Sequence, residues 1–211
     1  MVKLIFPIMS DTDLTTEQLI LEAAKKVFIS KGLDGTRMQE IADEAGINKS
    51  LLHYYFRSKD KLFDVIFREI VMSFAPGIVE ILNSPISLFD KIELFVGTYI
   101  DMLLQNPYIP GFLVNEVAKN PARLVTALKT HGVDPNIMRE QLRKEIEAGV
   151  IRPLKVEDLM ANLISLCVFP FMAKNIFSNM LDMSDDDYML FLAARKKEIP
   201  TFIINSIMLK K

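Results

Sequence analysis

Hydrophobic residues along this chain recur at helical spacing, and no segment shows the alternation of apolar and polar residues that is typical of a β-strand. The pattern begins at Thr15-x-x-Gln18, a capping box in which the threonine oxygen and the glutamine side chain satisfy free backbone N–H groups. The helix that follows has one apolar face, formed by Ile20, Ala23, Ala24, Val27 and Phe28. We predict that this first helix ends at Gly32.

Two short helices and a longer one are predicted next. A second capping box, Thr36-x-x-Gln39, marks the start of a short helix. Its apolar stripe comprises Met38, Ile41, Ala42 and Ala45. Gly46 is expected to end it, because glycine adopts the left-handed conformation that a helix C-terminus favours. Asn48 then caps a third helix, and Ser58 caps a fourth that continues beyond residue 70.

Proline, glycine and asparagine divide the remainder of the chain. The segments between them are predicted to be helical near residues 87–105, 112–119, 121–130, 135–148, 156–181 and 185–209. The helix at 156–181 is apolar nearly all round, which indicates cover on both sides, and Pro170 is expected to kink it. The sequence therefore predicts an all-α protein, with an N-terminal extension (1–13), a unit of three short helices (14–60) and a larger helical body (61–211) that a connecting helix joins to it.

Composition excludes several classes of protein. Half of the 211 residues are hydrophobic and a quarter are charged, which is typical of a soluble globular protein. The single cysteine, Cys167, rules out an internal disulfide and a cysteine metal cluster, and it fits a reducing compartment such as the cytoplasm. The two histidines, His53 and His131, lie in different segments, so no metal site and no cofactor is predicted.

The sequence also gives no indication of a membrane partner. The longest charge-free run, Leu159 to Ala173, is shorter than the roughly 20 residues that a transmembrane helix needs. The first ten residues lack the long apolar region and cleavage site of a secretory signal. Met9 would itself serve as a translation start, so we expect residues 1–8 to be dispensable.

The third helix carries an unusual combination of side chains. On a helical wheel, one side presents Lys49, Ser50, His53 and Tyr54. The other side is apolar and holds Leu51, Leu52, Tyr55 and Phe56. Every side chain of the first group can donate hydrogen bonds, which suits phosphate oxygens and the acceptors of the DNA major groove. Residues 46–61 also have a net charge of +3, although the whole chain stands at −2.

Two short helices joined by a glycine turn form the helix-turn-helix arrangement. Within residues 14–63, the glycine and threonine of KGLDGT, then IADEAGI, LLHYYF and K-D-K-L resemble the DNA-binding domain of tetracycline-repressor-like (TetR family) transcriptional regulators. EAGVIRP at 147–153 is similar to the turn that often precedes the family's last pair of helices. The resemblance implies a helix-turn-helix DNA-binding domain at 14–60 and a ligand-binding and dimerisation domain at 61–211.

The resemblance also implies partners and sites. Members of the family bind palindromic double-stranded DNA as homodimers, and they release it when a small molecule enters the C-terminal body. The positions that match the family's DNA contacts are Thr36, Lys49, Ser50, His53, Tyr54, Tyr55 and Lys59. The last two helices would pair with their copies through an apolar stripe of Leu159, Leu163, Leu166, Pro170, Phe177, Tyr188, Phe191, Leu192, Ile199, Phe202 and Ile203.

A pocket for the small molecule is expected between the connecting helix and the middle helices. The candidates, chosen for apolar character with an occasional polar group, are Phe74, Phe95, Tyr99, Met102, Phe112, Asn115, Met138 and Phe171.

Nothing in the sequence predicts an enzyme. It has no G-x-S-x-G motif, no phosphate-binding glycine loop and no cysteine–histidine pair. Ser184 with the aspartates after it has the composition of a helix start rather than of a catalytic carboxylate pair. Two alternatives to a homodimeric repressor stay open: an activator of the same architecture, and an all-α module that binds a ligand or partner and keeps only a relict DNA-binding domain.

Overall fold

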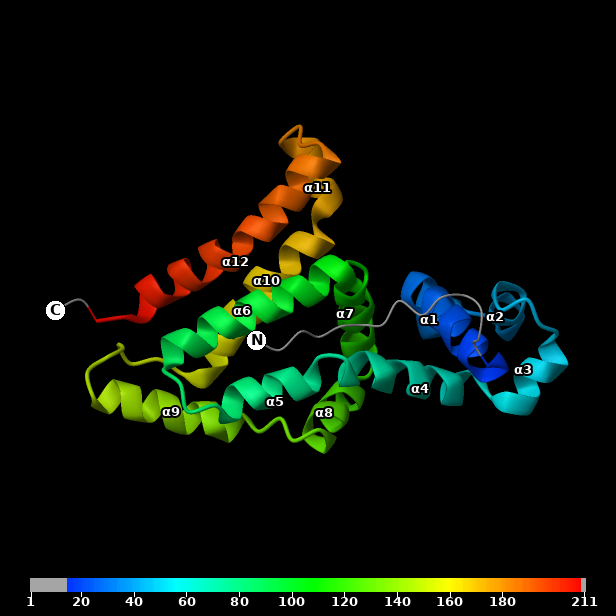
Figure 1. Cartoon of the computed structure of the whole chain (residues 1–211), viewed down its shortest axis with the longest axis horizontal. Coiled ribbons are helices and arrows are strands. Elements are labelled where there is room, and N and C mark those ends of the chain that lie inside the picture. The colour runs from blue at the N-terminus through cyan, green and yellow to red at the C-terminus, as the bar shows by residue number, and fades with distance from the viewer. Residues whose placement is uncertain (1–14, 210–211) are drawn as a thin grey trace. The chain divides into compact units, whose positions relative to one another are not determined.

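The computed structural model describes residues 15–209 and is helical throughout this range apart from turns and a single isolated bridge, between Ile151 and Met208 (Figure 1). This confirms the predicted all-α fold. The expected dispensability of residues 1–8 concerns a segment outside the described residues. The chain divides into two compact units, one ending at Phe67 and the other beginning at Arg68.

The N-terminal unit contains the predicted short helices and the start of a fourth. Their bounds are α1 Thr16–Gly35, α2 Met38–Glu44, α3 Lys49–Tyr55 and α4 Lys59–Met72. The Thr15 capping box is confirmed, because the Gln18 N–H donates to the threonine hydroxyl and the Thr15 N–H donates to the Gln18 side chain. Gly32 interrupts α1 with φ 68°, as its predicted role as a helix end requires. The rings of Phe28 and Phe63 meet edge to face at 4.9 Å in the core of this unit.

The second predicted capping box is wrong. Helix α2 begins one residue later, after Arg37, whose backbone N–H donates to the Glu40 carboxylate at 2.9 Å. The Thr36 hydroxyl instead donates to the Gly32 carbonyl at 2.7 Å, inside the unit. The left-handed backbone at Gly32 brings its carbonyl within reach of the Thr36 hydroxyl. Glu40, one residue after Gln39, then forms the capping box with Arg37, one residue after Thr36.

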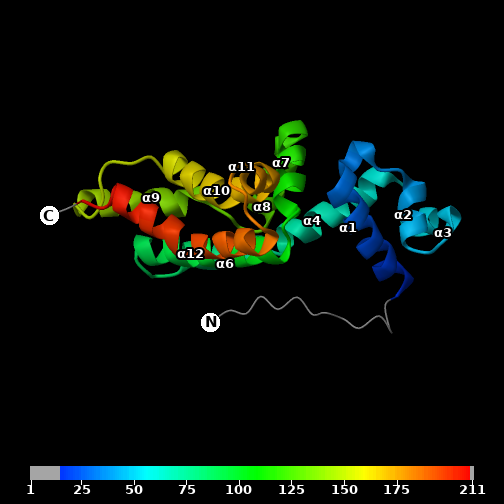
Figure 2. The same cartoon turned by 90° about the horizontal axis from the view of Figure 1, so that it is seen from above.

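The C-terminal unit, called the body here, consists of the remaining helices. They are α5 Ala75–Asn83, α6 Leu88–Gln105, α7 Ile109–Lys119, α8 Pro121–Thr130, α9 Pro135–Glu147, α10 Val156–Met172, α11 Lys174–Met180 and α12 Asp185–Ile207. Helix α6 is central: it packs against α12 and α10 and also against α5 and α9 (Figures 1 and 2). The Ser184 hydroxyl accepts from the Asp187 N–H at 3.1 Å, which confirms that this serine caps α12.

Two features of the body differ from the expected helices. The sequence does not predict α5, because Pro76-Gly77 is typical of a turn. Pro76 instead occupies the first turn of the helix, where a backbone N–H would form no intrahelical hydrogen bond. The helix expected at 156–181 is broken at Ala173 into α10 and α11, which are bent by 66°.

The break follows shortly after Pro170, whose carbonyl accepts the Tyr188 hydroxyl at 2.6 Å. Because Pro170 has no N–H, the Leu166 carbonyl loses its usual helical donor. The Arg195 guanidinium takes that place, through Nε at 3.3 Å and Nη2 at 3.1 Å. Helix α12 therefore supplies both polar partners that the proline end of α10 requires.

Within residues 15–209, no single helix is long and apolar enough to cross a membrane; α10 and α11 pass that test only when taken together across their bend.

Candidate nucleic-acid interface and a cavity in the body

The turn before α3 is set by Gly46, which has φ 67° and nothing within 4 Å of where a Cβ would lie. The Ile47 N–H reaches back to the Ala42 carbonyl at 3.0 Å and closes the end of α2. The Asn48 side chain then accepts the Leu51 N–H at 2.8 Å, which fixes the first turn of α3. Local hydrogen bonds therefore define both the turn and the start of the helix.

One face of α3 is buried and the opposite face is free. Leu52 is fully buried, as the helical wheel predicts. The side chains of Lys49, Ser50, His53 and Tyr54 are exposed, and none of them hydrogen-bonds another residue within the described range. Tyr54 is 80% exposed, so most of its ring and hydroxyl is open to an external partner. The arrangement offers an ammonium, a hydroxyl, an imidazole and a phenol to an external acceptor.

Tyr55 and Lys59 lie at the edge of this face. Tyr55 is 39% exposed, and its ring meets the Tyr54 ring edge to face at 5.5 Å. Lys59 is half-buried, and its ammonium donates to the Thr36 carbonyl at 3.0 Å. That contact ties the first turn of α4 to the segment between α1 and α2.

Thr36 differs from the expectation of a surface contact. Its side chain is only 2% exposed and its hydroxyl is used by the Gly32 carbonyl. The structure thus brings Thr36 and Lys59 together, but it places the threonine side chain in the interior. The motif match could not reveal this, because it fixes a position in the sequence and not the direction in which the side chain points.

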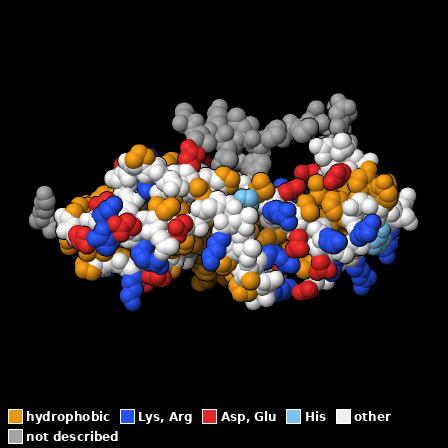
Figure 3. All heavy atoms as spheres, turned by 90° about the horizontal axis from the view of Figure 1, so that it is seen from below, with side chains coloured by type: hydrophobic (Ala, Val, Ile, Leu, Met, Phe, Trp, Pro, Cys, Tyr) orange, Lys and Arg blue, Asp and Glu red, His pale blue; other side chains and the backbone are white. Residues whose placement is uncertain are grey.

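Positive charge surrounds the exposed face of α3. Arg57 and Lys61 are exposed beside it, and the Ser58 hydroxyl accepts the Lys61 N–H at 3.2 Å at the start of α4. In Figure 3, Lys and Arg side chains and a histidine are visible at the end of the N-terminal unit that carries α3. Such a surface suits the phosphate backbone of nucleic acid.

Residues 20–66 match the family model described as "Bacterial regulatory proteins, tetR family", and this range contains α2, α3 and the whole polar face. The chain belongs to the TetR family. It is a transcriptional regulator with a helix-turn-helix DNA-binding domain, and its relatives are regulators rather than enzymes, as predicted.

Relatives match different lengths of this TetR-family regulator. The transcriptional repressor NicS of Pseudomonas putida is 27% identical over 84% of this chain and 89% of its own. The transcriptional regulator RutR of Escherichia coli is 42% identical, but over only 26% of each chain. The crystal structure of HlyIIR, a haemolysin II transcriptional regulator, has a TM-score of 0.65 at 24% identity and covers 92% of this chain and 98% of its own. It shares the fold.

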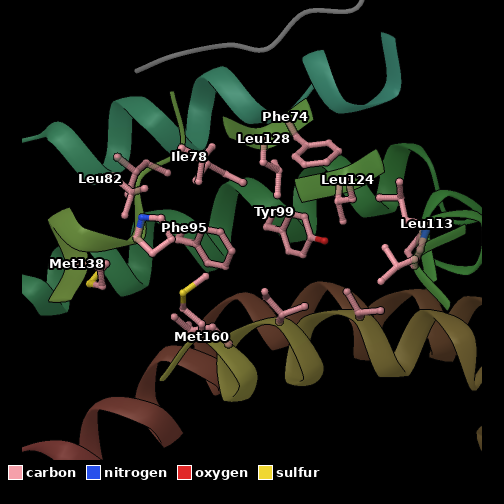
Figure 4. A pocket seen from close by; sticks show the side chains of 18 of the residues that line it. Phe74, Ile78, Leu82, Phe95, Tyr99, Leu113, Leu124, Leu128, Met138 and Met160 are labelled. Atoms are coloured by element: carbon pink, nitrogen blue, oxygen red, sulfur yellow. The ribbon is translucent and has the colours of Figure 1, made fainter. Parts of the chain in front are cut away.

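The body of the TetR-family regulator encloses a cavity of about 540 Å³, a size typical of small-molecule sites. Figure 4 shows side chains of α5, α6, α7, α8, α9 and α10 that converge on it. The lining comprises Phe74, Ile78, Ile81, Leu82, Lys91, Ile92, Phe95, Tyr99, Pro110, Leu113, Val114, Val117, Ala118, Leu124, Leu128, Val133, Pro135, Met138, Met160, Leu163, Ile164 and Val168.

Half of the candidates for the pocket line this cavity: Phe74, Phe95, Tyr99 and Met138. The others do not. Met102, Phe112 and Phe171 are buried elsewhere in the body, and Asn115 is exposed on the surface of α7. These residues have the expected chemical character, but their side chains do not line the cavity. The sequence of a helix that is apolar on several sides does not reveal which side faces the cavity.

Among the described residues that line the cavity, only Lys91 and Tyr99 carry polar side-chain groups. Lys91 is 5% exposed, and its ammonium donates to the Leu82 carbonyl at 2.6 Å. Burial lowers the pKa of the Lys91 ammonium below its ordinary value, because desolvation disfavours the charged form. The Tyr99 ring stacks on Phe95 at 5.3 Å, and burial raises the pKa of its phenol to about 12. Sequence reasoning missed Lys91, although it lies at helical spacing from both aromatic residues.

Most of the apolar stripe assigned to a dimer interface lies inside the body instead. Buried within one chain are Leu159, Leu163, Pro170, Tyr188, Leu192, Ile199 and Ile203, whereas Leu166, Phe177 and Phe191 are half-buried and Phe202 is exposed. Helix α12 packs chiefly onto α6, and α10 packs onto both α12 and α6 of the same chain. The apolar side chains that α10, α11 and α12 expose are Met160, Ile164, Phe169, Met172, Ile176, Met180, Met189, Leu190 and Phe202.

Proposed function

We propose that this TetR-family regulator is a homodimeric repressor that binds a palindromic operator and is released when an apolar small molecule fills the body cavity. The observation that carries the proposal is the exposed face of α3, where Lys49, Ser50, His53 and Tyr54 have no hydrogen-bond partner among the described residues. The repressor NicS, which matches 84% of the chain, supports repression over activation. The apolar cavity supports control by a ligand.

Selection of DNA from random oligonucleotides, followed by affinity measurements, tests the DNA-binding face. We expect an enriched palindrome. Lys49→Ala and Tyr54→Ala should each weaken binding by at least about 1 kcal/mol, and loss of Lys49 should also reduce the slope of affinity against salt. The control is Lys197→Ala, which removes the same charge from an exposed site on α12. Unchanged affinity in both α3 variants would refute the assignment of this face.

The proposed dimer uses the outward faces of the last helices. Phe169, Ile176, Leu190 and Phe202 are each more than half exposed, and isolated chains seldom leave so many large apolar groups in water. Leu190→Glu is therefore expected to shift the protein from dimer to monomer in analytical ultracentrifugation and to lower its operator affinity. Met72→Glu, on an exposed position of α4, is the control. A monomeric wild-type protein that enriches no DNA sequence would favour the relict-domain alternative.

A reporter assay separates repression from activation. Expression from a promoter that contains the selected palindrome should rise when the regulator is deleted. A fall in expression would identify an activator and overturn the repressor assignment.

A further inference from the structure

The body cavity has an uneven distribution of polar groups. Among the described lining residues, Lys91 is the one cation and Tyr99 the one other polar residue, and no carboxylate of the described residues forms an ion pair with Lys91. A lysine buried in this way destabilises the fold unless its charge is compensated, because an ammonium loses its hydration when it leaves water. The Leu82 carbonyl satisfies one of the three donors of the ammonium, and two remain for other acceptors.

The second polar group lies on the same helix. Lys91, Phe95 and Tyr99 follow one another at four-residue spacing along α6, so the Cα atoms of Lys91 and Tyr99 lie about 12 Å apart along the helix axis. The stacked rings of Phe95 and Tyr99 occupy the interval. Among the described residues, the Tyr99 hydroxyl has no hydrogen-bond partner. The lining thus carries one lysine and one phenol among apolar side chains.

We propose that the effector is an amphipathic monocarboxylate whose anionic end pairs with Lys91 and whose hydrocarbon part lies along Phe95 and Tyr99. The inference rests on the proposed function in treating the cavity as the effector site, and it adds an anionic end to the apolar molecule proposed there. A carboxylate supplies the missing countercharge and accepts the free ammonium donors. The volume of the cavity also limits the size of the effector. At roughly 30 Å³ for each water-sized group, 540 Å³ accommodates about 18 such groups.

Titration calorimetry with a matched set of ten-carbon probes tests this ligand class. Decanoate, 1-decanol and decylammonium share a chain and differ only in the charge of the head. Wild-type protein is expected to bind decanoate at least tenfold more tightly than 1-decanol, and decylammonium least tightly. Equal or tighter binding of 1-decanol, or failure of decanoate to bind, would overturn the proposal without the use of any variant.

Variants then locate the preference. Lys91→Met retains the length of the side chain and removes its charge, so decanoate should bind no more tightly than 1-decanol. Lys129→Met, on α8 but outside the lining, is the control and should retain the tenfold preference. If the Lys91→Met protein keeps the preference for decanoate, Lys91 is not the carboxylate partner and the inference fails.

Operator binding is measured separately, so that the two proposals can fail independently. The operator affinity of the wild-type protein is measured with and without each probe. If decanoate binds with the expected preference but never releases DNA, the ligand class stands and release by the ligand does not. If another molecule releases DNA while decanoate does not bind, the ligand class is wrong and the regulatory function stands.

Discussion

The contact between Arg195 and the Leu166 carbonyl offers a sharp test of how the body is held together. The carbonyl has lost its helical donor to Pro170, and two guanidinium N–H groups replace it. A hydrogen bond to a charged group contributes about 1.5–3 kcal/mol, and Arg195 is only half-buried, so the lower end of that range applies. We therefore expect Arg195→Met to reduce the free energy of unfolding by about 1.5 kcal/mol.

The explanation is best tested in a second background. In Pro170→Ala, residue 170 regains an N–H that can donate to the Leu166 carbonyl, so Arg195→Met should cost about 1 kcal/mol less than it does beside the proline. The cation–π contact of Arg195 with Phe191, at 5.7 Å, is lost in both backgrounds and cancels in the cycle. Urea unfolding at one fixed protein concentration gives all four free energies.

The control is Lys197→Met, a change two residues further along α12 at an exposed site, which should alter stability by less than about 0.5 kcal/mol. An equal cost of Arg195→Met in both backgrounds would show that the arginine does not compensate for the proline. In thermal unfolding, the single variant should melt about 3–6 °C below the wild type.

Two further results are expected. Asn48→Ala removes the side-chain acceptor of the Leu51 N–H and should destabilise the protein by about 1 kcal/mol, whereas Asn48→Asp should retain most of the stability. Circular-dichroism melting curves measure both variants, and an alanine variant as stable as the wild type would contradict the cap. Burial raises the pKa of the Cys167 thiol to about 12, so a thiol reagent at pH 8 should modify this cysteine only after unfolding; rapid modification of native protein would show that the site is open.

Helix caps were predictable because their chemistry is local. Thr15, Asn48 and Ser184 each bond a backbone N–H within three residues, and no distant part of the chain takes part. Thr36 has the same local pattern, but a carbonyl four residues earlier competes for its hydroxyl and prevails. That outcome depends on the left-handed turn at Gly32, which a pattern of capping residues does not describe.

Helix continuity was harder to predict than helix position. Proline at 76 lies in the first turn of α5, where it is favoured, whereas proline at 170 lies near the end of α10, where it removes a bond. The same residue type thus has opposite consequences at the two ends of a helix. At Pro76, no capping residue marked the start of a helix, since residue 74 makes no side-chain cap.

The sequence could not predict which apolar side chains point into the cavity. Tyr99 and Met102 belong to one helix and are similar in apolar character, yet Tyr99 lines the cavity and Met102 is buried in the core. The shape of a cavity depends on how several helices pack together, and residues of six helices, α5 to α10, line this one. Lys91 is the exception that the sequence could have revealed. A lysine spaced four and eight residues before two aromatic residues on an otherwise apolar helix face points into the body, and a charge placed there calls for a counterion.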